Sequence, residues 1–153
     1  MPARRGWSGP SSCPPSRSRK YRTLPLPDRS LPAGLRVFAV EDESLVAMQL
    51  EDMLEELGCV LVGLAMRVRR AMEMLDRGEA IDVAILDVNI AGEKVFPVAE
   101  RLHEAGVPFL FATGYGRAGL EGQWLDRPVV QKPYTPDQIA AAILEARAGT
   151  MAG

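Results

Sequence analysis

Apolar residues follow two alternating patterns along the chain from Leu35 onward. Short apolar runs rich in β-branched residues predict strands at residues 35–40, 59–66, 81–88, 108–113 and 128–133. Apolar residues spaced three and four apart predict helical segments at residues 44–58, 67–80 and 94–106, and a further helix from 135 onward. This alternation predicts the α/β class, as a doubly wound five-stranded parallel sheet with helices on both faces.

The helical segments also carry signals for their ends and their buried faces. The first is expected to end at Gly58 and to bury the stripe Leu45, Met48, Leu50, Met53, Leu54 and Leu57. The last is expected to begin with Thr135 as its cap and Pro136 at its first position. A fourth helical segment is expected between the strands at 108–113 and 128–133, before the final helix. It contains Gly114, Gly116, Gly119 and Gly122, and it should be short or fluid because glycine disfavours helix.

Residues 1–34 differ in composition from the rest of the chain. They are rich in Pro, Ser, Gly and Arg and have a net charge of +6, which leaves −8 for the remainder. They lack an apolar period and cannot bury enough surface to offset ordering entropy. We therefore predict a disordered, solvated basic extension at 1–34, one folded domain at 35–149 and a short tail at 150–153.

Composition excludes several classes of protein. No apolar run approaches the roughly 18 residues that span a bilayer, and the N-terminus lacks the apolar core of a secretion signal. The two cysteines, Cys13 and Cys59, have no metal or redox spacing and indicate a reducing compartment. We expect a cytoplasmic protein without membrane contact, and the acidic folded part argues against nucleic-acid binding.

Polar residues interrupt the predicted strands at their carboxyl ends. Glu41 and Asp42 follow the first strand, Asp87 lies near the end of the third, Thr113 ends the fourth, and Lys132 lies near the end of the fifth. Ligands of open α/β sheets bind beyond the carboxyl ends of the strands, so these side chains should converge. Clustered carboxylates repel one another unless a cation lies among them, and an all-oxygen set suits Mg²⁺. The combination predicts phosphoryl chemistry, which depends mainly on positioning and charge neutralisation.

At these strand ends the sequence resembles the response-regulator receiver domains of two-component signalling. The matching segments are "VEDE", "LDVNIAGE", "FATGY" and "VVQKPY", and together they cover about residues 35–148. "FATGY" is similar to a subgroup of single-domain receivers called the FAT GUY family. The resemblance implies a flavodoxin-like receiver fold.

The resemblance also implies roles for individual residues. Asp87 would be the phosphoacceptor, and Glu41 and Asp42 would hold Mg²⁺ together with Asp87. Asn89 would offer the metal its backbone carbonyl.

The remaining roles implied by the resemblance concern the phosphoryl group. Thr113 would contact it and Lys132 would pair with Asp87 or its oxygens, with a cis peptide bond before Pro133. One departure affects the switch: many receivers carry an aromatic residue three positions before this lysine, where this chain has Val129. Tyr115 is a candidate to replace part of that function.

The expected function is that of a single-domain response regulator. It would accept a phosphoryl group from a sensor histidine kinase or phosphotransfer protein and act through an unknown downstream protein, as a monomer or weak homodimer. It would not be a turnover enzyme; the alternative is a phosphate sink or relay intermediate. A phosphatase of the haloacid-dehalogenase kind typically has a second Asp where this chain has Asn89. A flavodoxin is disfavoured because the acids after the first strand would repel the FMN phosphate.

Overall fold

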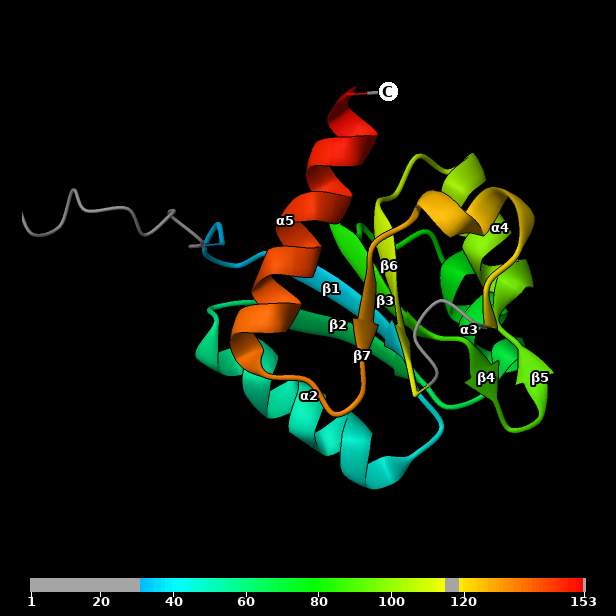
Figure 1. The fold of residues 1–153 in the computed structure, drawn as a ribbon, viewed down its shortest axis with the longest axis horizontal. Coiled ribbons are helices and arrows are strands. Elements are labelled where there is room, and N and C mark those ends of the chain that lie inside the picture. The colour runs from blue at the N-terminus through cyan, green and yellow to red at the C-terminus, as the bar shows by residue number, and fades with distance from the viewer. Residues whose placement is uncertain (1–30, 115–118, 153) are drawn as a thin grey trace, which may run out of the picture.

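The computed structural model describes residues 31–114 and 119–152, and it is built around a five-stranded parallel sheet (Figure 1). The strand order is β2-β1-β3-β6-β7, and every pairing is parallel. The strands are β1 (Arg36–Val40), β2 (Val60–Ala65), β3 (Val83–Asp87), β6 (Phe109–Thr113) and β7 (Val129–Gln131). The predicted doubly wound α/β fold is confirmed. Since β1 lies between β2 and β3, the chain changes direction across the sheet at this strand.

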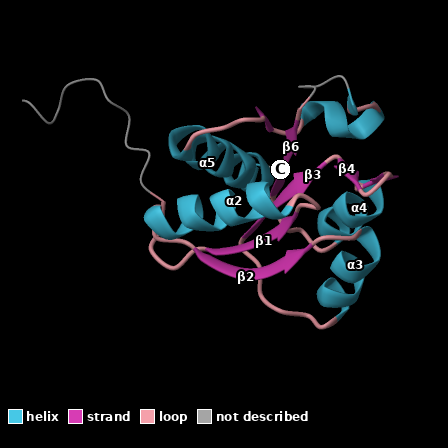
Figure 2. Ribbon diagram, turned by 90° about the horizontal axis from the view of Figure 1, so that it is seen from below, coloured by secondary structure: helices cyan, strands magenta, loops and turns pink. Residues whose placement is uncertain are grey.

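Alternate residues of the strands face two separate apolar layers. Val37 and Ala39 of β1 pack in the layer covered by α2 (Ser44–Glu56) and α5 (Pro136–Ala152). Phe38 and Val40 pack in the opposite layer, covered by α3 (Val68–Asp76) and α4 (Phe96–Glu104). Figure 2 shows helices on both sides of the sheet. Burial on both faces explains why these strands read as continuous apolar runs.

The start of α5 and the buried face of α2 test the finer predictions for the helices. Gln138 and Thr135 form a reciprocal cap: the Gln138 amide donates to Thr135 Oγ1 at 3.2 Å, and the Thr135 amide donates to Gln138 Oε1 at 2.9 Å. The predicted cap is therefore confirmed. The predicted stripe of α2 is wrong at Leu45 and Met48, which are 67% and 62% exposed. The apolar residues of α2 cover a wider arc than the stripe that the sheet can bury.

A short hairpin follows β3 and was not predicted. It pairs β4 (Asn89–Ile90) with β5 (Glu93–Lys94) in antiparallel fashion. Its two turn residues, Ala91 and Gly92, have φ of 51° and 87°. Positive φ at both central residues is typical of a type I′ turn, for which Asn-Gly is the favoured pair.

The segment between β6 and β7 contains no α-helix among its described residues. A 3₁₀ helix, η3 (Gly122–Asp126), takes that place and is anchored by the buried Trp124. The prediction of a short fourth helical segment is confirmed for residues 119–126. Tyr115 and Gly116 lie outside the described residues.

The extension predicted at the N-terminus lies almost entirely outside the described residues, which begin at Leu31. Within the described part of the chain, no helix has the length and apolar character needed to cross a membrane.

Replacing Ala91 with glycine should stabilise the protein. Its φ of 51° lies in the left-handed region, where the Cβ of an alanine clashes with the backbone and a glycine, which has no Cβ, does not. We expect Ala91→Gly to raise the free energy of unfolding by about 0.5–1 kcal/mol, measured by urea denaturation. Gly149→Ala is the control. Gly149 lies in α5, and a Cβ added there would meet no neighbouring atom, so this variant reports the general effect of exchanging glycine and alanine on the unfolded chain. A lower stability of Ala91→Gly would show that the turn imposes no strain.

Candidate functional site

The candidate site lies at the carboxyl edge of the sheet, on the side where the β4–β5 hairpin projects (Figure 1). Asp87 and Thr113 are the last residues of β3 and β6, and Lys132 is the residue directly after β7. Glu41 follows β1 directly and is held there by a hydrogen bond from its amide to the Ala65 carbonyl at 3.0 Å. The structure therefore places all the strand-end residues that the sequence singled out at the same edge of the sheet.

Lys132 links two of the carboxylates. Its Nζ lies 2.8 Å from Asp87 Oδ2 and 2.8 Å from Glu41 Oε1. All three side chains are largely withdrawn from solvent, with exposed fractions of 16%, 9% and 3% for Lys132, Asp87 and Glu41. A buried charge is tolerated when it is paired and hydrogen-bonded, and each of these groups meets that condition.

Burial and pairing have opposite effects on the protons at this site. Burial raises the pKa of Glu41 to about 7, against the opposing hydrogen bonds from Lys132 and the Glu43 amide. Burial also disfavours the charge on Lys132, but its hydrogen bonds to Asp87 and Glu41 outweigh burial and raise the pKa of the ammonium. Lys132 is therefore a permanent cation, whereas Glu41 ionises near neutral pH.

Four acidic side chains meet at the edge of the sheet. One carboxylate oxygen each from Glu41, Asp42, Glu43 and Asp87 lies within 4.8 Å of the other three. Such a set of hard oxygen donors fits Mg²⁺, which prefers a few carboxylates and keeps several waters. Glu43 was not among the site residues predicted from the sequence. It is the N-cap of α2, and its position next to Glu41 and Asp42 places it in the cluster.

Two other predicted residues lie where the sequence placed them. Asn89 follows Asp87 by two residues, and its amide points at Asp87 Oδ1 at 3.3 Å; the metal role of its carbonyl stays a prediction. Thr113 is 2% exposed, and its carbonyl accepts a hydrogen bond from the Lys132 amide at 2.9 Å. The peptide bond between Lys132 and Pro133 is cis, as predicted.

Val129 occupies the position where many receivers carry an aromatic switch residue. Val129 pairs with Phe111 in the sheet and packs at the margin of the apolar layer. In the same layer the ring of Trp124 stacks on Phe96 at 6.3 Å and meets Phe111 edge to face at 6.3 Å. An aromatic residue of η3 therefore packs in the same apolar layer as Val129.

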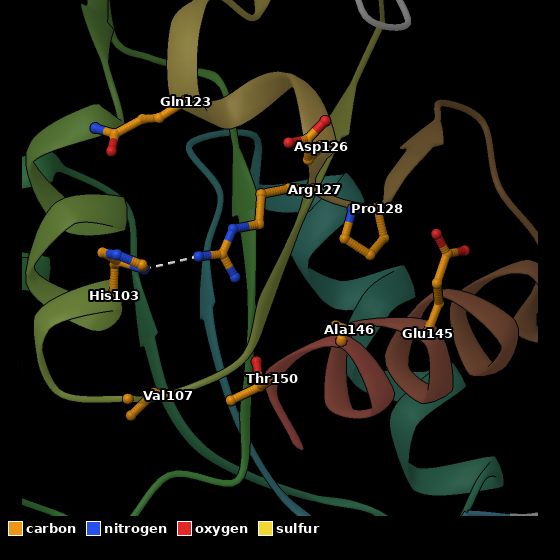
Figure 3. Close-up of a pocket in the computed structure, with 11 residues that line it drawn as sticks. His103, Val107, Gln123, Asp126, Arg127, Pro128, Glu145, Ala146 and Thr150 are labelled. Carbon is orange, nitrogen blue, oxygen red and sulfur yellow. Dashed lines mark hydrogen bonds between the residues drawn. The ribbon is translucent and has the colours of Figure 1, made fainter. Parts of the chain in front are cut away.

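A depression separate from the acidic cluster lies at the other end of the strands, where β6 and β7 begin. It has a volume of about 630 Å³ and is formed by the ends of α4, η3 and α5 (Figure 3). In it, the Arg127 guanidinium lies 2.8 Å from His103 Nδ1 and over the ring of Phe109 at 4.3 Å. His103 is exposed on α4 and belongs to no group of three or more potential metal ligands among the described residues.

Comparison with known proteins agrees with this geometry. Residues 37–144 match the model of the response regulator receiver domain. The chain belongs to this family. The matched residues include all four members of the acidic cluster and all five strands of the sheet apart from Arg36, the first residue of β1. The narrower FAT GUY resemblance stays a prediction.

Individual relatives show how the receiver domain occurs in longer and shorter chains. SdrG from Sphingomonas melonis Fr1 is 45% identical, with a TM-score of 0.66 over 74% of this chain and 99% of SdrG. PhyR from Brucella abortus is 29% identical, with a TM-score of 0.69 over 81% of this chain and 52% of that protein. The Phyllosphere-induced regulator PhyR of Methylorubrum extorquens is 28% identical over 116 residues, 72% of this chain and 42% of that protein. The chain thus spans less than half the length of this curated relative.

Neutralising Glu41 should change how stability depends on pH. Its folded pKa of about 7 lies above the ordinary value of 4.5, so its contribution to stability is complete below pH 4.5 and is lost as the pH rises through 7. Without divalent cations, Glu41→Gln should therefore gain about 2 kcal/mol relative to wild type between pH 5 and pH 8. Urea denaturation at several pH values measures this difference. Parallel profiles for the two proteins would contradict the raised pKa.

Proposed function

We propose that this receiver domain is a response regulator that accepts a phosphoryl group on Asp87 in the presence of Mg²⁺. The observation that carries the proposal is the contact of Lys132 with both Asp87 and Glu41 at 2.8 Å. This contact places a permanent cation beside Asp87, the side chain that would gain negative charge on phosphorylation. Family membership supports the same function.

The reaction needs a nucleophile, a cation and a hydrogen-bond donor. An Asp87 oxygen would form the bond to phosphorus while the bond between phosphorus and the donor's nitrogen breaks, and the electron pair leaves with that nitrogen. Mg²⁺ held by Glu41, Asp42 and Asp87, with the Asn89 carbonyl, would supply further neutralisation of the phosphoryl oxygens. Lys132 would then pair with a phosphoryl oxygen and Thr113 would donate its hydroxyl to another.

The chain would act as a switch rather than as a turnover enzyme. The donor would be a phosphohistidine of a sensor histidine kinase or a phosphotransfer protein, and the signal would pass to a downstream protein by direct contact. One structural neighbour, PhyR from Bartonella quintana, is described as an anti-anti-sigma factor; it is 26% identical, with a TM-score of 0.70 over 82% of this chain. Its description supports output through protein contacts in this group of receivers.

Phosphate incorporation tests the proposal directly. Incubation with acetyl phosphate and Mg²⁺ should add one phosphoryl group to the wild-type protein, read by mass spectrometry of the intact chain. Asp87→Asn should add none, because it lacks the nucleophile. Asp52→Asn, in an exposed aspartate of α2, is the matched control and should behave as wild type. Mg²⁺-independent labelling, or labelling of Asp87→Asn, would refute the assignment.

Exposed apolar residues beside the site are the proposed contact for the protein donor. Leu45 and Met48 lie on α2, next to a groove of about 300 Å³ that Val46, Met53 and Pro133 line together with Lys132. Lys132, which contacts Asp87, lines this groove, and exposed apolar area is typical of contact sites.

Charge substitution on this surface should separate protein donors from small donors. From a panel of phosphorylated histidine kinases, the fastest donor is selected with the wild-type protein. Met48→Lys should slow transfer from it by about tenfold or more, because a charge then replaces apolar contact area. Labelling by acetyl phosphate should stay unchanged. Val60→Lys, in an exposed apolar residue of β2, is the control; equal slowing by both variants would argue against a specific contact.

A further inference from the structure

Each carboxylate implied in the metal site accepts a hydrogen bond from a backbone amide. The Glu43 amide donates to Glu41 Oε2 at 3.1 Å, and the Asn89 amide donates to Asp87 Oδ1 at 3.3 Å. In both cases the amide lies two residues further along the same segment. These two carboxylates are therefore oriented by their own local backbone, and Lys132 holds the other oxygen of each.

Asp42 is oriented differently. Its Oδ2 accepts a hydrogen bond of 2.8 Å from the amide of Ala91, which lies 49 residues away in the turn of the β4–β5 hairpin. Lys132 contacts Glu41, Glu43 and Asp87 but not Asp42. In residues 31–114 and 119–152, the Ala91 amide is the one hydrogen-bond or ion-pair partner found for this carboxylate.

The backbone of Ala91 is strained where it makes this contact. It is the one non-glycine residue with positive φ in the described part of the chain. Asparagine or glycine would adopt this conformation at lower cost, and alanine offers no side-chain hydrogen bond in return. Such outliers persist where the surrounding structure requires them, and they gather at functional sites.

We propose that Ala91 is a positioning residue for the metal site and acts through its amide on Asp42. The hydrogen bond holds Oδ2 and so fixes the orientation of the carboxylate, one oxygen of which lies within 4.8 Å of oxygens of Glu41, Glu43 and Asp87. Carboxylate ligands of metals are commonly oriented by hydrogen bonds of this kind. The inference rests on the proposed function, because it requires that Asp42 binds Mg²⁺.

The arrangement also couples the hairpin to the metal. If Mg²⁺ binds better when Asp42 is held by Ala91, then bound Mg²⁺ stabilises that hydrogen bond by the same factor. The hairpin begins two residues after Asp87, so metal binding would order the chain directly beside the phosphoacceptor.

The experiment removes the amide proton without changing the side chain. A full-length chain with lactic acid in place of alanine at position 91 carries an ester there and cannot donate. Titration with Mg²⁺ alone, followed by calorimetry, should show a dissociation constant about tenfold higher than that of wild type. The same ester placed at Ala80, an exposed residue outside the acidic cluster, is the control; its dissociation constant should stay within about twofold of that of wild type. Equal Mg²⁺ affinities of the ester and the wild type would overturn the inference.

A second measurement on the wild-type protein is independent of whether the ester variant folds. Exchange of the Ala91 amide hydrogen, followed by NMR, should slow severalfold when Mg²⁺ is added, because the metal and the hydrogen bond favour the same conformation. Unchanged exchange with Mg²⁺ bound would also overturn it. If the wild-type protein does not bind Mg²⁺, the metal step of the proposed function fails and the role of Ala91 fails with it. If it binds Mg²⁺ but the amide has no effect, only the role of Ala91 fails.

Discussion

The site depends on one ammonium group that pairs with two buried carboxylates. Glu41 follows β1 and Asp87 ends β3, and these two strands pair in the parallel sheet, so their charges are brought together by the same pairing that builds the core. Like charges at this separation and burial would oppose folding. Lys132 reaches both from the far edge strand and offsets that repulsion. Its removal would leave two carboxylates buried beside each other, which is the more costly arrangement.

Strand order places the other phosphoryl-binding group. Since β6 lies between β3 and β7, Thr113 emerges between Asp87 and Lys132. The hydrogen bond from the Lys132 amide to the Thr113 carbonyl continues the pairing of β6 with β7 beyond the last ladder residues. Two residues before Thr113 in β6, the ring of Phe111 packs edge to face against the ring of Trp124 in η3. The strand that ends at the site is therefore packed directly against the 3₁₀ helix that precedes β7.

Asp42 shows how a local rule is broken next to a functional group. A type I′ turn favours asparagine where this chain has Ala91, and the resulting strain coincides with the contact to Asp42. The other two carboxylates need no such contact, because amides of their own segments hold them. Of the three carboxylates proposed to hold the metal, two are oriented by their local backbone and one by a distant turn.

The sequence by itself determined the alternation of strands and helices and the residues at the strand ends. Both are local properties: burial on two faces demands apolar runs, and a charge such as Asp87 or Lys132 marks where a run leaves the core. It did not determine the membership of Glu43 in the acidic cluster or the exposure of Leu45 and Met48. Nor did it show the hairpin that holds Asp42. These features depend on which segments meet in space, because the arc of a helix that is buried and the partner of a carboxylate are decided by packing between distant parts of the chain.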